Sequence, residues 1–171
     1  MIDTMTAADH NLGLNLVRLA PLIISTASVM CQIDQTAAIR PFAQPTLAKS
    51  GGVVLPYWFP IFLTRTIPVV VLSYPLAFGT ALLNTWKYGA TLDNTTKYFY
   101  WAGMVFSAGH FLYGPSAVKI IVRINGTKNP GPRNTLAVHE WLAMNFIRLL
   151  TIDVPGFLMY LCAVLSAARF I

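Results

Sequence analysis

The sequence predicts an all-α protein that crosses a membrane as a four-helix bundle. Of the 171 residues, 56% are hydrophobic and only 11% are charged, whereas soluble domains carry about 25% charged residues. The mean hydropathy of +0.59 agrees with this composition. The apolar residues gather in four runs that are long enough to cross a bilayer. A chain of this length is expected to form one membrane-embedded domain, residues 1–171.

The first apolar run extends from about residue 12 to residue 33 and carries Arg18 near its amino end. An arginine in this place is expected to extend its charged group to the membrane surface. The polar segment 34–56 follows and contains proline and glycine. Because it is too long for a tight turn, we expect a connection that forms a lid or a re-entrant piece.

Basic residues bound the other three runs at nearly equal spacing: Arg65 to Lys87, Lys97 to Lys119, and Arg148 to Arg169. Each interval measures about 32–33 Å as a helix, close to the ~30 Å of a bilayer's hydrocarbon core. Pro68 and Pro75 should bend the second membrane helix. Together with the first run, these intervals predict four membrane helices.

The net charge of +6 comes from dispersed basic residues beside the apolar runs. This pattern is typical of membrane-protein loops rather than of a nucleic-acid-binding surface. Lysine and arginine are more numerous around the first and third loops, so we expect these loops in the cytoplasm and both chain ends across the membrane. The endoplasmic reticulum or a related membrane is the expected location. The sequon Asn94-Thr95-Thr96 would then face the compartment where glycosylation takes place.

Polar side chains inside the apolar runs indicate a candidate site, because unpaired polar groups in hydrocarbon cost several kcal/mol. At about 100° per residue, Trp141, Asn145 and Arg148 fall on one face of a helix. His110 is the deepest ionisable side chain, with Tyr113 one turn away. Asp153 lies about one turn deeper than Arg148. In the expected topology Tyr113, Asn145, Arg148 and Asp153 gather in the cytoplasmic half of the membrane together with Arg65 and Lys119. We therefore expect a polar cluster between helices that opens toward the cytoplasmic leaflet.

The cluster offers a base (His110 or Asp153), a cation that stabilises negative charge (Arg148) and orienting donors. This set suits proton abstraction beside a carbonyl, or acid-assisted opening and cyclisation of a lipophilic substrate. The predicted catalytic residues are His110, Asn145, Arg148 and Asp153, and the predicted substrate-binding residues are Trp58, Arg65, Tyr113 and Trp141.

Each residue also has a plainer interpretation. Arg65 and Arg148 can simply mark the membrane boundary, Asp153 can pair with a basic neighbour, and His110 can donate a bond to another helix. Three function classes therefore stay open. They are a cofactor-independent oxygenase, an epoxide hydrolase, cyclase or isomerase with the same acid–base residues, and a non-catalytic membrane scaffold or transport subunit.

No cofactor site is recognisable in the sequence. Cys31 and Cys162 stand alone within apolar runs, and no zinc or iron–sulfur spacing occurs. A phosphate loop, a dinucleotide fingerprint and a hydrolase nucleophile elbow are also missing. We expect neither a metal nor another cofactor, and expect as partners a lipophilic small molecule and membrane lipids but no nucleic acid. The sequence does not predict the oligomeric state.

One segment resembles a known family. Trp141-x-x-x-Asn145-x-x-Arg148 is similar to the W-x-x-x-N-x-x-R segment of the fungal anthrone oxygenase-like membrane proteins, which are small four-span proteins of polyketide biosynthesis. Gly114-Pro115-Ser116-Ala117 lies where that family has a Pro-Thr-Asn turn, and Trp58-x-x-x-Phe62 lies where it has a Trp and a Tyr. The Thr-Asn and the Tyr are absent here. The resemblance implies cofactor-free oxidation of an aromatic polyketide such as an anthrone, through an enolate that reacts with oxygen.

Overall fold

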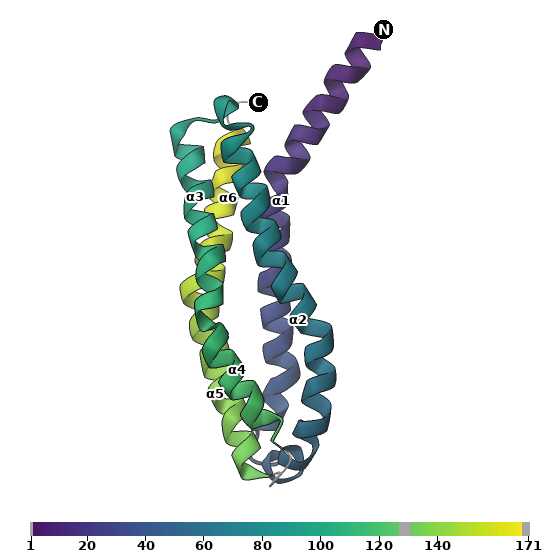
Figure 1. The fold of residues 1–171 in the computed structure, drawn as a ribbon, viewed down its shortest axis with the longest axis vertical. Coiled ribbons are helices and arrows are strands. Elements are labelled where there is room, and N and C mark those ends of the chain that lie inside the picture. Colours follow the sequence, from purple (N-terminus) through teal and green to yellow (C-terminus); the bar gives the residue numbers. More distant parts are fainter. Residues whose placement is uncertain (1, 127–130, 169–171) are drawn as a thin grey trace.

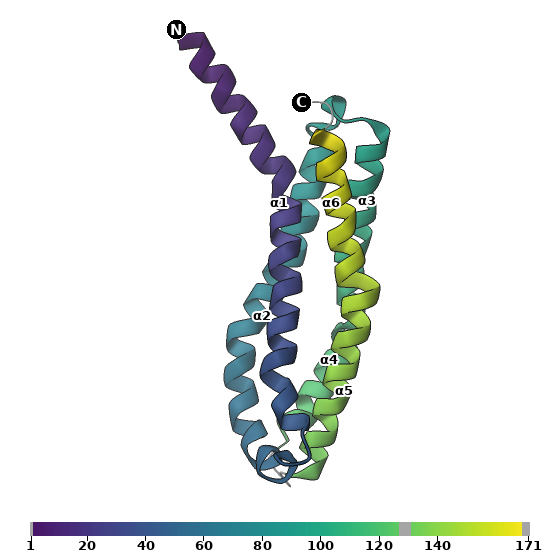
Figure 2. The same ribbon diagram turned by 180° about the vertical axis from the view of Figure 1, so that it is seen from behind.

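The protein is an antiparallel bundle of four long helical segments. The computed structural model describes residues 2–126 and 131–168, and every regular element in these ranges is helical. The segments are α1 (Ile2–Ile39), α2 (Ala48–Trp86), α3 (Asn94–Gly109) continued by α4 (Gly114–Ile124), and α5 (Pro132–Arg148) continued by α6 (Val154–Ala168). The beginning of α1 and the end of α6 lie at one end of the bundle, and the α1–α2 connection, the end of α4 and the beginning of α5 lie at the other (Figures 1 and 2). The predicted all-α four-helix bundle is confirmed.

The outer surface of the bundle is apolar. Leu72, Val105 and Leu165, on three different segments, are 60%, 68% and 57% exposed. A surface of this kind needs lipid as its solvent, since soluble monomers rarely expose large contiguous apolar patches. The described residues contain four helical segments long and apolar enough to cross a membrane. The chain is therefore an integral membrane protein.

The prediction of a long connection over residues 34–56 is wrong. α1 continues to Ile39 and α2 begins at Ala48, so that only Arg40–Leu47 joins them, partly as the 3₁₀ helix η1 (Arg40–Ala43). Proline does not end α2, which holds four prolines: Pro56, Pro60, Pro68 and Pro75. Neighbouring helices and local adjustment of the backbone allow proline inside membrane helices. Figure 1 shows that α2 is bent, as Pro68 and Pro75 predict.

The other two segments each contain an irregular turn near mid-length. The 3₁₀ turn η3 (His110–Tyr113) joins α3 to α4, and the π turn η4 (Leu149–Asp153) joins α5 to α6. Pro115 and Pro155 follow these turns. Proline has no N–H to donate to the carbonyl four residues earlier, and its ring clashes with that carbonyl. Regular α-helix is therefore disfavoured at both places.

The interior contains two apolar clusters with a polar layer between them. One cluster, toward the α1–α2 connection, includes Phe59, Val138 and Trp141. The other, toward the chain ends, includes Tyr100 and Tyr160. The two irregular turns contribute His110 (η3) and Asp153 (η4) to the polar layer, so the helices are least regular where the candidate site lies.

Candidate active site

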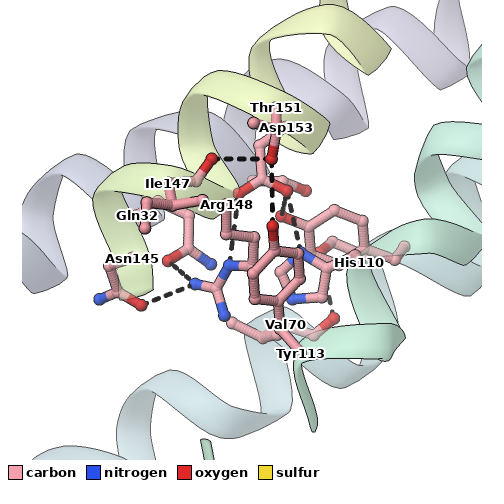
Figure 3. A network of polar contacts seen from close by, with 12 residues as sticks. Gln32, Val70, His110, Tyr113, Asn145, Ile147, Arg148, Thr151 and Asp153 are labelled. Carbon is pink, nitrogen blue, oxygen red and sulfur yellow. Dashed lines mark hydrogen bonds and ion pairs between the residues drawn. The ribbon is translucent and has the colours of Figure 1, made fainter. Parts of the chain in front are cut away.

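Asp153 is the centre of a buried polar network (Figure 3). Its Oδ1 accepts hydrogen bonds from the Tyr74 hydroxyl at 3.0 Å and from His110 Nδ1 at 2.9 Å. Its Oδ2 lies 3.5 Å from Nε of Arg148. Asp153, His110 and Arg148 are only 4%, 4% and 5% exposed. The carboxylate thus joins a cation, an imidazole and a phenol that come from three separate helical segments.

The π turn η4 places Arg148 and Asp153 on the same face. In η4 the Val154 N–H bonds to the Leu149 carbonyl, five residues earlier, instead of four. Residues five apart therefore take the relation that residues four apart have in an α-helix, where they share a face. Pro155 favours this wider turn because it cannot complete a regular α-helical bond to Thr151. π turns of this kind occur frequently at functional sites.

Arg148 is held by two side-chain amides as well as by Asp153. The guanidinium donates to Oδ1 of Asn145 at 3.0 Å and to Oε1 of Gln32. Because arginine can only donate, both amides turn their oxygen toward it. Their NH₂ groups, and Nε1 of Trp141, are buried and find no hydrogen-bond acceptor within the described residues. The region around Arg148 has a surplus of donors, which suits an oxygen that carries negative charge.

His110 is oriented by its two neighbours. Its ring stacks on the Tyr74 ring with centroids 3.6 Å apart and planes inclined by 26°. Since a carboxylate only accepts, the proton of the neutral ring lies on Nδ1, facing Asp153, and Nε2 keeps a free lone pair. No hydrogen bond to Nε2 is found in the described part of the chain. His110 is therefore placed as a proton acceptor that Asp153 holds in one tautomer.

A cavity of about 210 Å³ lies beside this network, and both His110 and Arg148 line it. Tyr74 lies nine residues from the exposed Arg65 along α2, and His110 lies nine residues from the exposed Lys119 along η3 and α4. Both intervals correspond to roughly 13 Å. Both intervals therefore place the rings of Tyr74 and His110 well inside the hydrocarbon region, where an ionisable side chain indicates a functional site.

Five of the eight predicted site residues gather here. His110, Asn145, Arg148 and Asp153 belong to the network, and Trp141 lines the cavity while packing edge-on against Phe59 at 5.6 Å. No three His, Cys, Asp or Glu side chains lie together as a metal site within residues 2–126 and 131–168. The resulting arrangement can remove a proton and stabilise the oxyanion that results.

The other three predicted residues do not line the cavity. The Tyr113 hydroxyl shares a 3.2 Å hydrogen bond with Thr151 in η4 and does not line the cavity. Trp58 stacks on Phe62 with centroids 5.0 Å apart, in the aromatic packing near the α1–α2 connection. Arg65 is exposed, and no polar contact of its side chain is found in the described residues. Arg65 thus fits the plainer interpretation, a residue at the membrane boundary.

Two residues of the network, Gln32 and Tyr74, were not predicted. Gln32 is 1% exposed and accepts from Arg148, and Tyr74 is 6% exposed and contacts both Asp153 and His110. An uncharged amide inside an apolar run was a usable signal for Gln32, because buried polar groups in membrane helices need partners. Tyr74 carries no such signal, since tyrosine is ordinary in apolar helices.

Comparison with known proteins finds three similar chains from fungi. The chain is 29% identical over 155 residues to the probable epoxidase scpX of Mollisia scopiformis, a match that covers 90% of this chain and 97% of that protein. It is 28% identical to the epoxidase gkaX of Penicillium citrinum (91% and 96% covered) and 29% identical to the epoxidase pydX of an Acremonium species (91% and 96%). No family model matches the sequence, and no solved structure matches it. The anthrone oxygenase-like family is not among these names. The chain is thus similar, along nearly its whole length, to fungal proteins named as epoxidases.

Proposed function

We propose that this protein is a membrane-embedded biosynthetic enzyme that oxygenates a lipophilic, polyketide-type substrate. The observation that carries the proposal is the buried arrangement of His110, Asp153 and Arg148 beside an apolar cavity. The similarity to proteins named as epoxidases supports oxygenation with an epoxide product. An endomembrane location, with the first and third loops in the cytoplasm, belongs to the same proposal.

His110 is the base in this reaction. Its Nε2 takes a proton from an enol, a phenol or a carbon beside a carbonyl, and Asp153 stabilises the imidazolium that forms. Arg148 and the surrounding donors stabilise the substrate oxyanion. The electron-rich carbon then reacts with O₂ to give a peroxide anion, to which the imidazolium returns the proton.

The electron balance separates two kinds of substrate. An anthrone or a hydroquinone-type enol supplies two electrons itself, so one oxygen atom enters the product and the other leaves as water. An isolated double bond has neither these electrons nor a proton for His110 to remove, and its epoxidation consumes a two-electron reductant for each O₂, so it does not fit this mechanism. Oxygen uptake and reductant consumption, measured together, therefore identify the substrate class.

Isotope labelling tests the proposal. Membranes containing the protein are supplied with an anthrone or a hydroquinone-type enol, under ¹⁸O₂ in ordinary water and then under ordinary O₂ in H₂¹⁸O. An oxygenase places one ¹⁸O atom from the gas in the product. Label from water would indicate an epoxide hydrolase, and turnover without O₂ a cyclase or isomerase. No turnover of any lipophilic compound would indicate a scaffold or transport subunit.

A matched pair of arginine variants shows whether the network carries the activity. Arg148→Gln should abolish turnover, because the oxyanion loses its cation. Arg65→Gln removes an exposed arginine that lies outside the network and should leave turnover within about twofold. Equal effects of the two substitutions would contradict the proposed site.

A further inference from the structure

The cavity beside His110 opens sideways, between two helical segments, instead of toward the loops. Its wall on one side is α2 and on the other η3 and α4. The outermost lining residues are apolar and exposed: Ile67 (44%) and Val71 (50%) on α2, Phe111 (46%) on η3 and Val118 (60%) on α4. In this bundle, exposed apolar side chains face lipid. The mouth of the cavity is therefore bordered by side chains that contact acyl chains.

The depth of the mouth follows from the helices themselves. Ile67 and Val71 lie two and six residues inward from Arg65, and Val118 and Phe111 lie one and eight residues inward from Lys119. These intervals correspond to roughly 2–12 Å below the level of the basic residues. The opening thus covers the outer and middle depth of one leaflet, on the side of the first and third loops.

The size of the cavity limits what enters it. Pockets that enclose a whole drug-sized ligand measure about 300–1,000 Å³, whereas this one holds about 210 Å³. Its lining is predominantly apolar, with Gln35, Thr66, His110, Trp141 and Arg148 as the polar exceptions. Only a segment of a polyketide-sized molecule fits, and the rest must remain outside the protein.

We propose that the substrate is an elongated, lipid-dissolved molecule that inserts one segment between α2 and α4 while its remainder stays among the acyl chains. The inserted segment carries the reacting carbon to His110 and its oxygen to Arg148. This inference rests on the proposed function, because it takes the occupant to be the substrate. It adds the substrate's route, which is lateral entry from one leaflet, and the substrate's shape, which is long enough to extend out of the cavity.

Photolabelling tests the route without requiring turnover. The protein in phosphatidylcholine nanodiscs is irradiated with a long-chain fatty alcohol that carries a terminal diazirine, and labelled residues are identified by mass spectrometry. Label is expected on inner lining residues such as Val70 and Gly114 as well as on the lipid-facing surface. Val118→Trp narrows the mouth and should remove most of the inner label. Val122→Trp, one turn along α4 and outside the cavity lining, should not.

The same comparison is made from the other side of the mouth. Val71→Trp lies at the opening, whereas Val69→Trp, on the same helix and 43% exposed, lies outside the lining. Inner residues that stay unlabelled in the wild type, or equal labelling in the two variants of each pair, would overturn the lateral route.

Kinetics then separates this inference from the proposed function. With a substrate that the wild type converts, Val118→Trp should lower kcat/KM by at least about tenfold, mainly through KM, since added bulk in a fitted space disfavours occupancy. Val122→Trp should stay near wild type. If the wild type shows no turnover but its inner lining residues are labelled, the proposed enzymatic function is wrong and the lateral route is not. If the wild type turns over its substrate and the two variants have equal kcat/KM, the lateral route is wrong and the enzymatic function is not.

Discussion

Replacing Asp153 with asparagine removes the negative charge that faces Arg148 while keeping the shape of the side chain. Arg148 is 5% exposed, and its other partners, Gln32 and Asn145, are neutral. The substitution therefore leaves a buried cation without a counter-ion. An amide oxygen can still accept from Tyr74 or His110, so the loss should come chiefly from the charge.

The magnitude can be bounded. Removing one partner of a buried ion pair costs about 3–5 kcal/mol, and Arg148→Met should cost a similar amount because it leaves the carboxylate of Asp153 unpaired. The double variant, Arg148→Met with Asp153→Asn, removes both charges and should be much less destabilised than the sum. We expect a coupling energy of at least about 2 kcal/mol.

The measurement is unfolding by sodium dodecyl sulfate in mixed micelles, followed by tryptophan fluorescence. Glu140→Gln is the control, because it breaks an ion pair with Arg123 in which both side chains are about 40% exposed. Exposed pairs contribute little, so this variant should unfold close to the wild type. Additive effects in the double variant, with each single change below about 1 kcal/mol, would refute a charged buried pair.

Four other predictions concern activity, packing and orientation. His110→Gln keeps a hydrogen-bonding side chain but loses the proton-accepting nitrogen, so turnover should fall by about 10²–10⁴ at normal protein levels. Near-normal turnover would make the histidine structural. Arg148→Lys should lose nearly as much activity as Arg148→Ala, because an ammonium cannot reproduce the planar guanidinium contacts. Full activity of the lysine variant would contradict this. Gly103→Ala puts a Cβ 2.4 Å from the Tyr160 ring and should destabilise the protein by about 1–3 kcal/mol, which the detergent titration measures; an unchanged midpoint would contradict it. A cysteine label at position Arg133 should react only with reagents on the cytoplasmic side, and labelling from the opposite side alone would reverse the orientation.

The sequence alone was sufficient to predict the four-helix bundle and the central residues of the polar network. The cost of polar groups in hydrocarbon singles out His110 and Arg148 whatever the packing, and helical periodicity adds Asn145 and Trp141 to one face. Helix ends were less predictable. The length of an apolar run reflects the thickness of the hydrocarbon layer. A helix continues beyond that layer as long as its backbone hydrogen bonds are satisfied, as α1 and α2 do.

The contacts between segments were not accessible from the sequence. Whether Tyr74 meets His110 depends on how α2 and α3 are rotated about their axes, and packing along their whole length sets that rotation. From the local sequence alone, Arg65 and Trp58 were predicted as substrate-binding residues in the same way as Trp141. Only the structure shows that Arg65 faces outward and that Trp58 packs away from the cavity.

The π turn η4 also has a consequence for comparing related chains. It accommodates one extra residue within an otherwise continuous helical segment. A chain with one residue fewer between Arg148 and Val154 could keep its membrane spans and its hydropathy. It would form a regular α-helix here, in which the arginine and the carboxylate, now four residues apart, still share a face. A chain of the same length with a regular α-helix at this point would instead have its last helix rotated by about 100° relative to the Trp141–Arg148 face, and its carboxylate would lie away from the guanidinium. A single-residue gap at this point in an alignment is therefore compatible with a shared site.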